Sequence, residues 1–398
     1  MHPADEIRGT KSTKLADKKI VLGVTGSIAA VECVRLSREL IRHGAHILPV
    51  MTPSATKIIH PDALEFATGI KPIIELTGKT EHVLFCGNVK NPADLLLISP
   101  CTSNTFAKIA HGIDDTAVTT FASTAIGSKI PVVIVPAMHI SMYNNKIAQK
   151  NIEICKKIGI NVISPRMIGS KAKIADIIEI TENVIRIIGK KDLAKKKILI
   201  IGGATAEPVD DIRIFTNKSS GKTAIALAVA AYERNAEVEL WLANTKKPAP
   251  HFISVKPFDT INDLEKLVKK HDLSKYNTII NCAAISDYKP KKTPGKIPSN
   301  QKDLTLRLSP TPKIIQQIRK KAPKTKIIAF KVEETKETIK KKSIDLLKNN
   351  KLDFVIGNTI KGFESDSNEI WIIDKLGKTK KIEDKKTKLA DTILSLIK

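Results

Sequence analysis

The stretch TNKSSGKT, at positions 216–223, carries residues suited to phosphate chemistry. Its last three letters are how a Walker A loop ends, and such a loop wraps its backbone N–H groups around a triphosphate. The Walker A motif also requires a glycine five residues before Gly221, and Thr216 stands there. The stretch is therefore not predicted to be a Walker A loop, and its serines and glycine need another explanation.

Small polar residues also come after two strands predicted in the first half. In GVTGSIAA, Gly23 and Gly26 form G-x-x-G, which falls short of the dinucleotide fingerprint G-x-G-x-x-G. A glycine turn with a serine at a helix start is nevertheless an anion site, although a plain turn is an equal alternative. The stretch SPCTSNT places hydroxyls and Asn104 at a strand end, where Thr102 or Ser103 would serve equally as a helix N-cap.

Two further patterns have a structural alternative. PAMHISMYNN (136–145) comes after another core strand, and its two methionines could simply pack in a core. His82, in KTEHVLFCGN, is a lone histidine, and such a residue is more often structural than catalytic. Spacing alone does not assign a function to either pattern.

Composition excludes several classes of protein. The net charge is +25, but only ten of the 66 basic residues are arginine and aromatic residues are few, so no nucleic-acid partner is expected. The apolar runs are too short to span a membrane, and the N-terminus does not resemble a signal peptide. Five scattered cysteines without a C-x-x-C pair indicate neither a disulfide framework nor a zinc site. A lysine-rich surface also suits small anionic substrates. We therefore expect a cytoplasmic protein that binds such substrates.

Buried strands and helices alternate along all 398 residues, which predicts an α/β fold with parallel sheets. A helix is expected from Ser27 to about His43, with Ile28, Val31, Val34 and Ile41 on its apolar side, and another around 172–188. The charged connector GKKDLAKKK (189–197) marks a domain boundary. The predicted segments are a polar extension (1–17) and two doubly wound domains (18–190 and 191–398).

The order of several motifs resembles a known family. GSIAA, the histidine of EHV, SPCTSNT and PAMHISMY resemble the homo-oligomeric flavin-containing cysteine decarboxylases. GGATAEPVDDIRIFTNKSSGK resembles a ligase signature, and NCAAISDY, PGKIP, IIAFKVEET and GNTIKGFESDSNEI come next in the family order. From about residue 18 onward, the chain resembles the bifunctional phosphopantothenoylcysteine decarboxylase/phosphopantothenate–cysteine ligases of coenzyme A biosynthesis. The resemblance implies two Rossmann-like domains, a flavodoxin-like flavoprotein domain and then a ligase domain.

For the ligase half, the resemblance implies that CTP activates the carboxylate of 4'-phosphopantothenate as an acyl-cytidylate, which the amine of cysteine then attacks. Asn217 would stabilise the acyl intermediate, Lys296 would face the triphosphate, and Asp287 would lie at the CTP and Mg²⁺ site. The implied CTP contacts are Asn281, Cys282, Ala283, Asp287, Lys296, Pro312, Lys313, Ile314, Ile315, Phe330, Lys342 and Lys348. For Lys342 and Lys348, a position on a solvated, lysine-rich helix face is an equal alternative. Whether the nucleotide is CTP or ATP stays open.

For the decarboxylase half, the resemblance implies that FMN oxidises the terminal thiol to a thioaldehyde, which lets carbon dioxide leave before the flavin reduces the product back. His82 would be the base at the thiol. The implied FMN contacts are Gly26, Ser27, Ser54, Ser103 and Asn104. The implied substrate contacts are Pro136, Ala137, Met138, His139 and Met142.

Two positions depart from the family pattern. His139 stands where the family has an asparagine that grips the substrate carboxylate, and a histidine can also donate a hydrogen bond. The stretch SPRMIGSKAKIAD lacks the cysteine that reprotonates the product in bacterial relatives. Lys171, Lys173 or a water molecule would have to supply that proton.

Two alternatives remain open from the sequence. One is a two-domain NAD(P)-dependent oxidoreductase, although neither half has a full G-x-G-x-x-G. The other is a ligase whose flavin-binding first domain has no catalytic role. The family also implies a homo-oligomer, with decarboxylase trimers joined through ligase dimers and no membrane partner.

Overall fold

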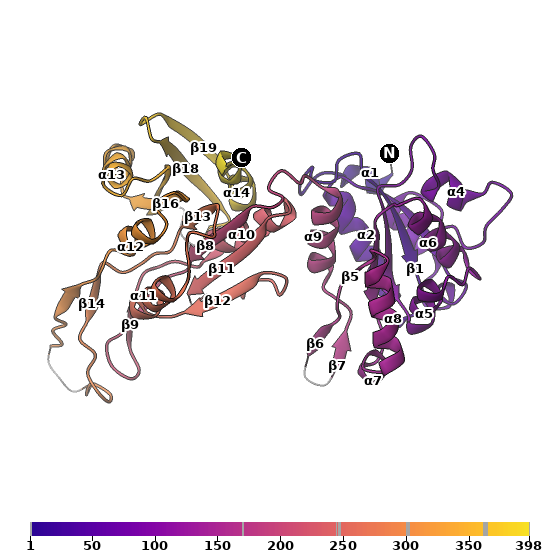
Figure 1. Cartoon of the computed structure of the whole chain (residues 1–398), viewed down its shortest axis with the longest axis horizontal. Coiled ribbons are helices and arrows are strands. Elements are labelled where there is room, and N and C mark those ends of the chain that lie inside the picture. The colour runs from indigo at the N-terminus through magenta and orange to yellow at the C-terminus, as the bar shows by residue number, and fades with distance from the viewer. Residues whose placement is uncertain are drawn as a thin grey trace. The chain divides into compact units, whose positions relative to one another are not determined.

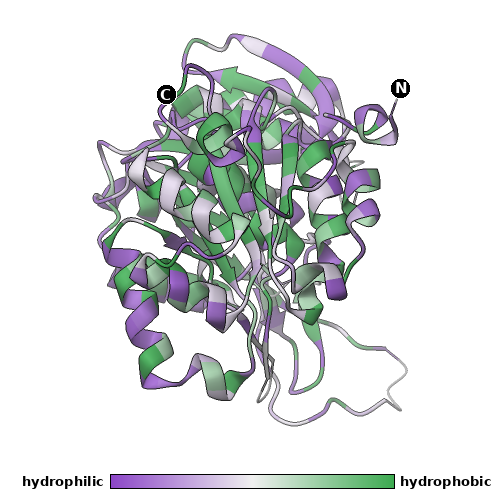
Figure 2. Ribbon diagram, turned by 90° about the vertical axis from the view of Figure 1, so that its right-hand side faces the viewer, coloured by the Kyte–Doolittle hydropathy of each residue, from purple (hydrophilic) through white to green (hydrophobic). Residues whose placement is uncertain are grey.

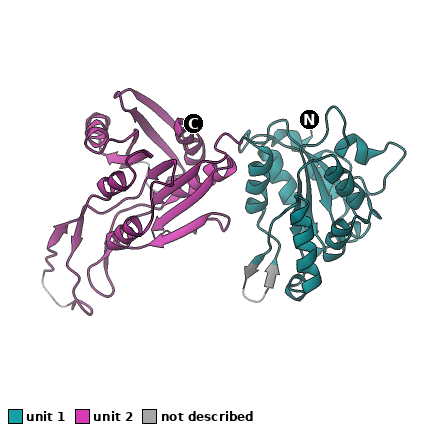
Figure 3. Cartoon of the chain, in the orientation of Figure 1, with its two compact units in different colours: residues 1–190 teal, residues 191–398 magenta. Residues whose placement is uncertain are grey.

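The computed structural model describes residues 2–168, 171–243, 245, 248–299, 303–360 and 365–397. The chain forms two compact units, unit 1 (1–190) and unit 2 (191–398), which are coloured separately in Figure 3. No helix in the described ranges is long and apolar enough to cross a bilayer.

Unit 1 is built on a five-stranded parallel sheet with the strand order β2-β1-β3-β4-β5. Its strands are β1 (Lys19–Val24), β2 (His46–Met51), β3 (Leu95–Cys101), β4 (Val132–Pro136) and β5 (Asn161–Val162). The central strands are buried throughout and apolar except for Ser99, because helices cover both faces of the sheet. This order is that of the flavodoxin-like fold, so the predicted fold class is confirmed for this half.

Two layers of helices cover this sheet (Figure 1). One face carries α1 (Pro3–Glu6), α2 (Cys33–Arg42), α3 (Pro61–Thr68) and α9 (Ile177–Ile188). The other carries α4 (Glu81–Cys86), α5 (Ser103–His111), α6 (Ala117–Gly127) and α8 (Lys146–Lys157). Figure 2, which faces unit 1, shows hydrophobic strands between helices with hydrophilic outer faces.

The helix expected from Ser27 differs from its prediction. A 3₁₀ helix, η1 (Ile28–Glu32), precedes α2, and Ile28 and Val31 are 76% and 49% exposed. Their assignment to the apolar side was wrong because a 3₁₀ turn has three residues per turn, which rotates these side chains away from the sheet. Val34 and Ile41 do pack in the core.

Two other segments of unit 1 differ from their predictions. The helix expected around 172–188 begins only at Ile177, because β7 (Lys171–Lys173) pairs with β6 (Arg166–Ile168) in a hairpin. The N-terminal segment, predicted as a polar extension, packs against unit 1. Its Leu15 is fully buried, and the Arg8 guanidinium donates a hydrogen bond to the carbonyl of Ala45.

Unit 2 contains an eight-stranded sheet with the order β12-β11-β8-β13-β16-β17-β18-β19. The strands are β8 (Lys197–Gly202), β11 (Glu237–Ala243), β12 (Ser254–Phe258), β13 (Thr278–Asn281), β16 (Lys326–Glu333), β17 (Phe354–Thr359), β18 (Ser367–Asp374) and β19 (Thr379–Lys385). The strands from β12 to β17 are parallel, and β18 and β19 are antiparallel. Strand order reverses between β8 and β13, so a ligand crevice is expected at their carboxyl ends.

Helices cover both faces of this second sheet as well. One face carries α10 (Lys222–Glu233) and α14 (Lys386–Leu394), which pack against each other. The other carries α11 (Ile261–Lys270), α12 (Ile314–Lys321) and α13 (Lys336–Asn349). Two short antiparallel ribbons pair β9 (Ala206–Pro208) with β10 (Ile214–Thr216) and β14 (Tyr288–Pro290) with β15 (Leu308–Pro310). The doubly wound fold predicted for the second half is confirmed.

Candidate functional site

The residues predicted to bind FMN lie along one edge of the unit 1 sheet. Ser27 comes after β1, Ser54 after β2, and Ser103 and Asn104 after β3. Because these strands are parallel neighbours, their carboxyl ends share this edge. A Cβ atom on Gly26 would lie 2.6 Å from the Cβ of Ser54, so a glycine is required where these two turns meet.

Hydrogen bonds tie the turns at this edge together. The Thr25 hydroxyl donates to the carbonyl of Pro100 at 2.8 Å and accepts from the N–H of Thr102 at 2.9 Å. The Thr102 hydroxyl caps α5 by accepting from the N–H of Thr105, so the N-cap interpretation of this stretch is correct for Thr102. Ser103 stands in the first turn of α5, at the edge where Ser27 begins η1. Hydroxyls and helix-start N–H groups are donors suited to a flavin phosphate, so the residues present fit that group.

The predicted substrate residues come after β4 at the same edge. Pro136 is buried, whereas Met142 is 48% exposed, so core packing does not account for this methionine. The Nδ1 of His139 accepts a hydrogen bond from the N–H of Ser141 at 3.3 Å and caps the short helix α7 (Ile140–Tyr143). With Nδ1 as the acceptor, a neutral His139 carries its proton on Nε2 and keeps one donor for a ligand.

His82 lies on α4, which packs against α6 on the sheet face opposite α2. Its Nδ1 atom is buried and has no hydrogen-bond partner among the described residues. No hydrogen bond in the described ranges joins His82 to the residues predicted for FMN. An unpartnered ring nitrogen is compatible with the predicted role of His82 at a bound substrate.

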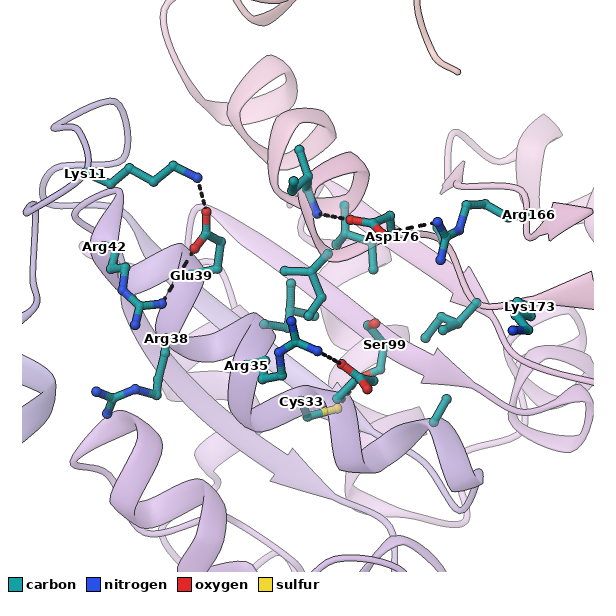
Figure 4. Close-up of a pocket in the computed structure, with 18 residues that line it drawn as sticks. Lys11, Cys33, Arg35, Arg38, Glu39, Arg42, Ser99, Arg166, Lys173 and Asp176 are labelled. Atoms are coloured by element: carbon teal, nitrogen blue, oxygen red, sulfur yellow. Dashed lines mark hydrogen bonds and ion pairs between the residues drawn. The ribbon is translucent and has the colours of Figure 1, made fainter. Parts of the chain in front are cut away.

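A cavity of about 770 Å³ lies elsewhere in unit 1, between α2, the N-terminal segment and α9 (Figure 4). It contains none of the residues predicted to bind FMN or substrate. Its side chains form ion pairs, including Arg166 with Asp176 at 3.2 Å and Glu39 with Lys11. Lys173, proposed as a proton donor, lines this cavity, and the side chain of Lys171 lies outside the described residues.

In unit 2, most of the predicted nucleotide residues line one cavity of about 440 Å³. They are Asn281, Ala283, Asp287, Pro312, Lys313, Ile314, Ile315, Phe330 and Lys342. Cys282 instead lines a second, smaller cavity, while Lys296 and Lys348 line neither of the two. Lys348 is exposed on α13, which agrees with the alternative interpretation that it belongs to a solvated helix face. Asp345 and Asn349, which the motifs did not indicate, also line the larger cavity.

Asp287 is the carboxylate predicted for the metal. Its Oδ1 accepts from the Nζ of Lys313 at 2.6 Å, and its side chain is 69% exposed. The described residues contain no group of three potential metal ligands. A Mg²⁺ ion commonly binds through one or two carboxylates plus substrate phosphates, so a single accessible carboxylate fits an ion that arrives with a nucleotide.

Asp210 anchors the loop that carries Lys296. Its buried carboxylate accepts from the N–H of Arg213 at 2.6 Å and from the N–H of Ile297 at 3.1 Å. Burial opposes ionisation, but these hydrogen bonds outweigh it and hold the pKa of Asp210 well below its usual range. The adjacent Asp211 accepts a hydrogen bond from the N–H of Gly295. Asp210 and Asp211, which both belong to the predicted ligase signature, therefore hold the backbone on either side of Lys296.

Asn217 is brought to the end of β13. Its Nδ2 donates to the carbonyl of Ala284 at 3.1 Å. Cys282, at the same strand end, donates its S–H to the carbonyl of Ile201 at 3.3 Å, and burial raises the pKa of its thiol to about 12. This cysteine is therefore a packing residue at neutral pH, because its thiolate form is suppressed.

The smaller cavity has a volume of about 80 Å³ and lies at the strand-order reversal. It is lined by Gly203, residues 219–224, residues 282–284, Phe330, Val332, Asn358, Asn368 and Lys386. The start of α10 was predicted to bind phosphate. Asn358 and Asn368 fall within the GNTIKGFESDSNEI stretch but received no individual role, and Lys386 lies outside the quoted motifs.

Two family models match the chain, and together they define a two-part flavoprotein. Residues 8–189 match the Flavoprotein family, and residues 193–398 match the DNA/pantothenate metabolism flavoprotein C-terminal domain. The coenzyme A biosynthesis bifunctional protein CoaBC of Thermococcus kodakarensis is 45% identical over 94% of this chain and 93% of its own. The CoaBC protein of Methanocaldococcus jannaschii is 38% identical over 100% of this chain and 98% of its own. This chain belongs to the family of bifunctional coenzyme A biosynthesis proteins.

Proposed function

We propose that this chain carries out two successive reactions of coenzyme A biosynthesis. Unit 2 joins 4'-phosphopantothenate to cysteine at the expense of CTP, and unit 1 decarboxylates the product to 4'-phosphopantetheine with FMN. The observation that carries the proposal is the larger cavity of unit 2, where segments 281–287 and 312–315 meet Phe330 and Lys342. These segments are those that the family resemblance assigned to CTP.

In the ligase reaction, a carboxylate must become an electrophile. Lys313 and Lys342 place positive charge at the cavity, where it would offset the charge of a triphosphate, and Asp287 would hold Mg²⁺. The amide of Asn217, at the end of β13, would donate to the developing oxyanion. Lys296 would reach the triphosphate from the loop that Asp210 and Asp211 anchor.

In the decarboxylase reaction, bound FMN would supply the two-electron chemistry that provides an electron sink for the leaving carboxylate. Gly26, Ser27, Ser54, Ser103 and Asn104 would hold it at the open edge of the sheet. His82 would take the proton of the substrate thiol. The Nε2–H of His139 would bind the substrate carboxylate, in the role that an asparagine has in the family.

The edge of unit 1 that would hold FMN also exposes apolar side chains, which supports a homo-oligomer. Ile28 is 76% exposed, and Val31 and Met142 are each about half exposed. Burial of such side chains stabilises an interface between copies. Trimers of unit 1 joined through dimers of unit 2 would provide that burial, in a cytoplasmic enzyme.

One end-point assay tests the proposal. The purified protein is mixed with 4'-phosphopantothenate, cysteine, CTP and Mg²⁺, and the products are identified by mass spectrometry. We expect 4'-phosphopantetheine and CMP. Accumulation of 4'-phosphopantothenoylcysteine alone would show that the ligase is active and that unit 1 is impaired or used differently, and absence of CMP would refute the ligase assignment.

A further inference from the structure

We propose that Lys386 binds a phosphate group in the smaller cavity of unit 2 and so favours phosphorylated ligands. This proposal rests on the proposed ligase function. The phosphate would belong either to 4'-phosphopantothenate or to the nucleotide, and the two sources share the same chemistry. No motif assigned a role to Lys386, which lies about 165 residues after the NKSSGK stretch.

Lys386 places a cation in a buried position. It is the first residue of α14, is 9% exposed and lines the cavity. No carboxylate in the described ranges lies within ion-pair distance of its Nζ. Asp366 is the acidic residue that acts to raise the pKa of Lys386, but its carboxylate pairs with Lys222 at 2.8 Å. An isolated charge in a buried position is costly, so the site calls for a negative ligand.

Two amides that line this cavity give a second, independent indication of a ligand, and one of them, Asn358, is a buried residue. Asn358 is 6% exposed, and its Oδ1 has no hydrogen-bond partner among the described residues. The Oδ1 of Asn368, which also lines the cavity, is likewise buried without a partner in the described ranges. An amide group can present its NH₂ to an anion after a half-turn, which for Asn358 gives up the 3.4 Å hydrogen bond from its Nδ2 to the carbonyl of Thr359.

The start of α10 adds main-chain donors to the same cavity. Its N-cap is Gly221, which has φ 72° and no side chain to cap the helix. A Cβ atom at this position would lie 2.4 Å from Cγ2 of Thr245, so the turn is compatible only with glycine. The first N–H groups of an α-helix have no partner within the helix, and the helix dipole favours an anion beside them.

Size and charge agree with one phosphate group. The 80 Å³ volume is several times the roughly 10–15 Å³ that a single water molecule needs, and far below that of a whole nucleotide. Burial, together with the nearby Lys222, lowers the pKa of Lys386 and so disfavours its charged form in the absence of ligand. A bound phosphate reverses this effect because it stabilises the protonated amine.

The test compares Lys386→Met with Lys386→Arg and with the control Lys388→Met, which alters an exposed lysine on the same helix. Pyrophosphate release from CTP and 4'-phosphopantothenate is measured while each substrate is varied. For Lys386→Met we expect one KM to rise about 10- to 100-fold, because a charge-assisted hydrogen bond is lost, while kcat changes little. The affected KM identifies which substrate supplies the phosphate. Lys386→Arg should retain most of the affinity, and Lys388→Met should match the unmodified protein.

A stability measurement separates binding from a structural role and does not depend on turnover. Inorganic phosphate and pyrophosphate should raise the Tm of the unmodified protein and of Lys388→Met, but not that of Lys386→Met. Without ligand, Lys386→Met should melt at the same or a higher temperature, since a buried charge has been removed. An equal phosphate-induced rise in Lys386→Met, or unchanged KM values with a lower Tm, would overturn the proposal. If the unmodified protein releases no pyrophosphate, the ligase function fails while this measurement still tests Lys386.

Discussion

Units 1 and 2 share a doubly wound design but present their predicted site residues differently. In unit 2 most of these residues line two cavities, a smaller one at the reversal between β8 and β13 and a larger one beside β13, β16 and α13. In unit 1 they lie after successive strands along an open edge, and the large cavity of that unit lies elsewhere. Parallel strands are sufficient to align chemical groups, but additional segments are needed to enclose them.

The segments beyond the parallel strands account for this difference. In unit 2, the antiparallel strands β18 and β19 lead to α14, whose first residue closes the smaller cavity. Unit 1 ends after α9 and leaves Ile28 and Val31 exposed beside its turns. One chain lines both cavities of unit 2, whereas in the proposed oligomer a second copy would cover the open edge of unit 1.

The largest expected effect is that of substituting His82, which should impair decarboxylation and leave the ligase reaction intact. His82→Gln should lower decarboxylation of supplied 4'-phosphopantothenoylcysteine about 10²- to 10⁴-fold, the usual contribution of a general base, and leave CMP release unchanged. Carbon dioxide release and CMP formation are measured on the same preparation. His60→Gln, at an exposed helix cap, is the control. Equal activity of His82→Gln and the unmodified protein would remove His82 from the mechanism.

The reciprocal change is Asn217→Ala in unit 2. Loss of an oxyanion donor should lower kcat for CMP formation about 10²- to 10³-fold, while decarboxylation of supplied 4'-phosphopantothenoylcysteine continues. The exposed neighbour Lys218 provides a control as Lys218→Ala. A rise in KM alone would mean that Asn217 binds substrate without stabilising the intermediate.

A smaller effect tests whether the open edge of unit 1 holds the flavin. Gly26→Ala places a methyl group against Ser54, where a Cβ would lie only 2.6 Å from the Cβ of that serine. Overpacking costs about 1–3 kcal/mol, and because the turn must shift to relieve it, a loss of that size from flavin binding would lower the affinity roughly 5- to 150-fold. Flavin retained after dialysis is measured by absorbance, with Gly127→Ala as a control because that position has open space. Full retention would place the flavin away from this turn.

The smallest effect concerns the stability of unit 1. His43, whose Nε2 lies 3.5 Å from the Glu39 carboxylate, and Lys11 together lower the pKa of Glu39 from about 4.5 to about 2, although burial opposes the shift. A lowered carboxylate pKa adds stability above pH 4.5, and this stability is lost as the pH falls toward 2. Glu39→Gln should cost about 1–2 kcal/mol of unfolding free energy near pH 7. Denaturant melts at several pH values should show the difference vanish near pH 2, and a pH-independent difference would contradict this cause.

The sequence by itself determined the alternation of strands and helices, the division into two doubly wound halves and the motifs at the strand ends. These features are local, since a run of buried residues and the glycine turn after it occupy a few neighbouring positions. The N-cap at Thr102 and the strand that ends in Asn281 could be predicted in the same way. The order of the motifs was enough to indicate the family.

Only the tertiary structure decided which distant residues meet. The anchoring of the Lys296 loop by Asp210, and the meeting of Asn358, Asn368 and Lys386 with the start of α10, depend on strand order and on how α14 packs. The exposure of Ile28 likewise depends on the 3₁₀ geometry of η1, which an apolar pattern does not reveal. Periodicity specifies which face of an element is apolar, whereas the partners across that face are chosen when the sheet and its covering helices assemble.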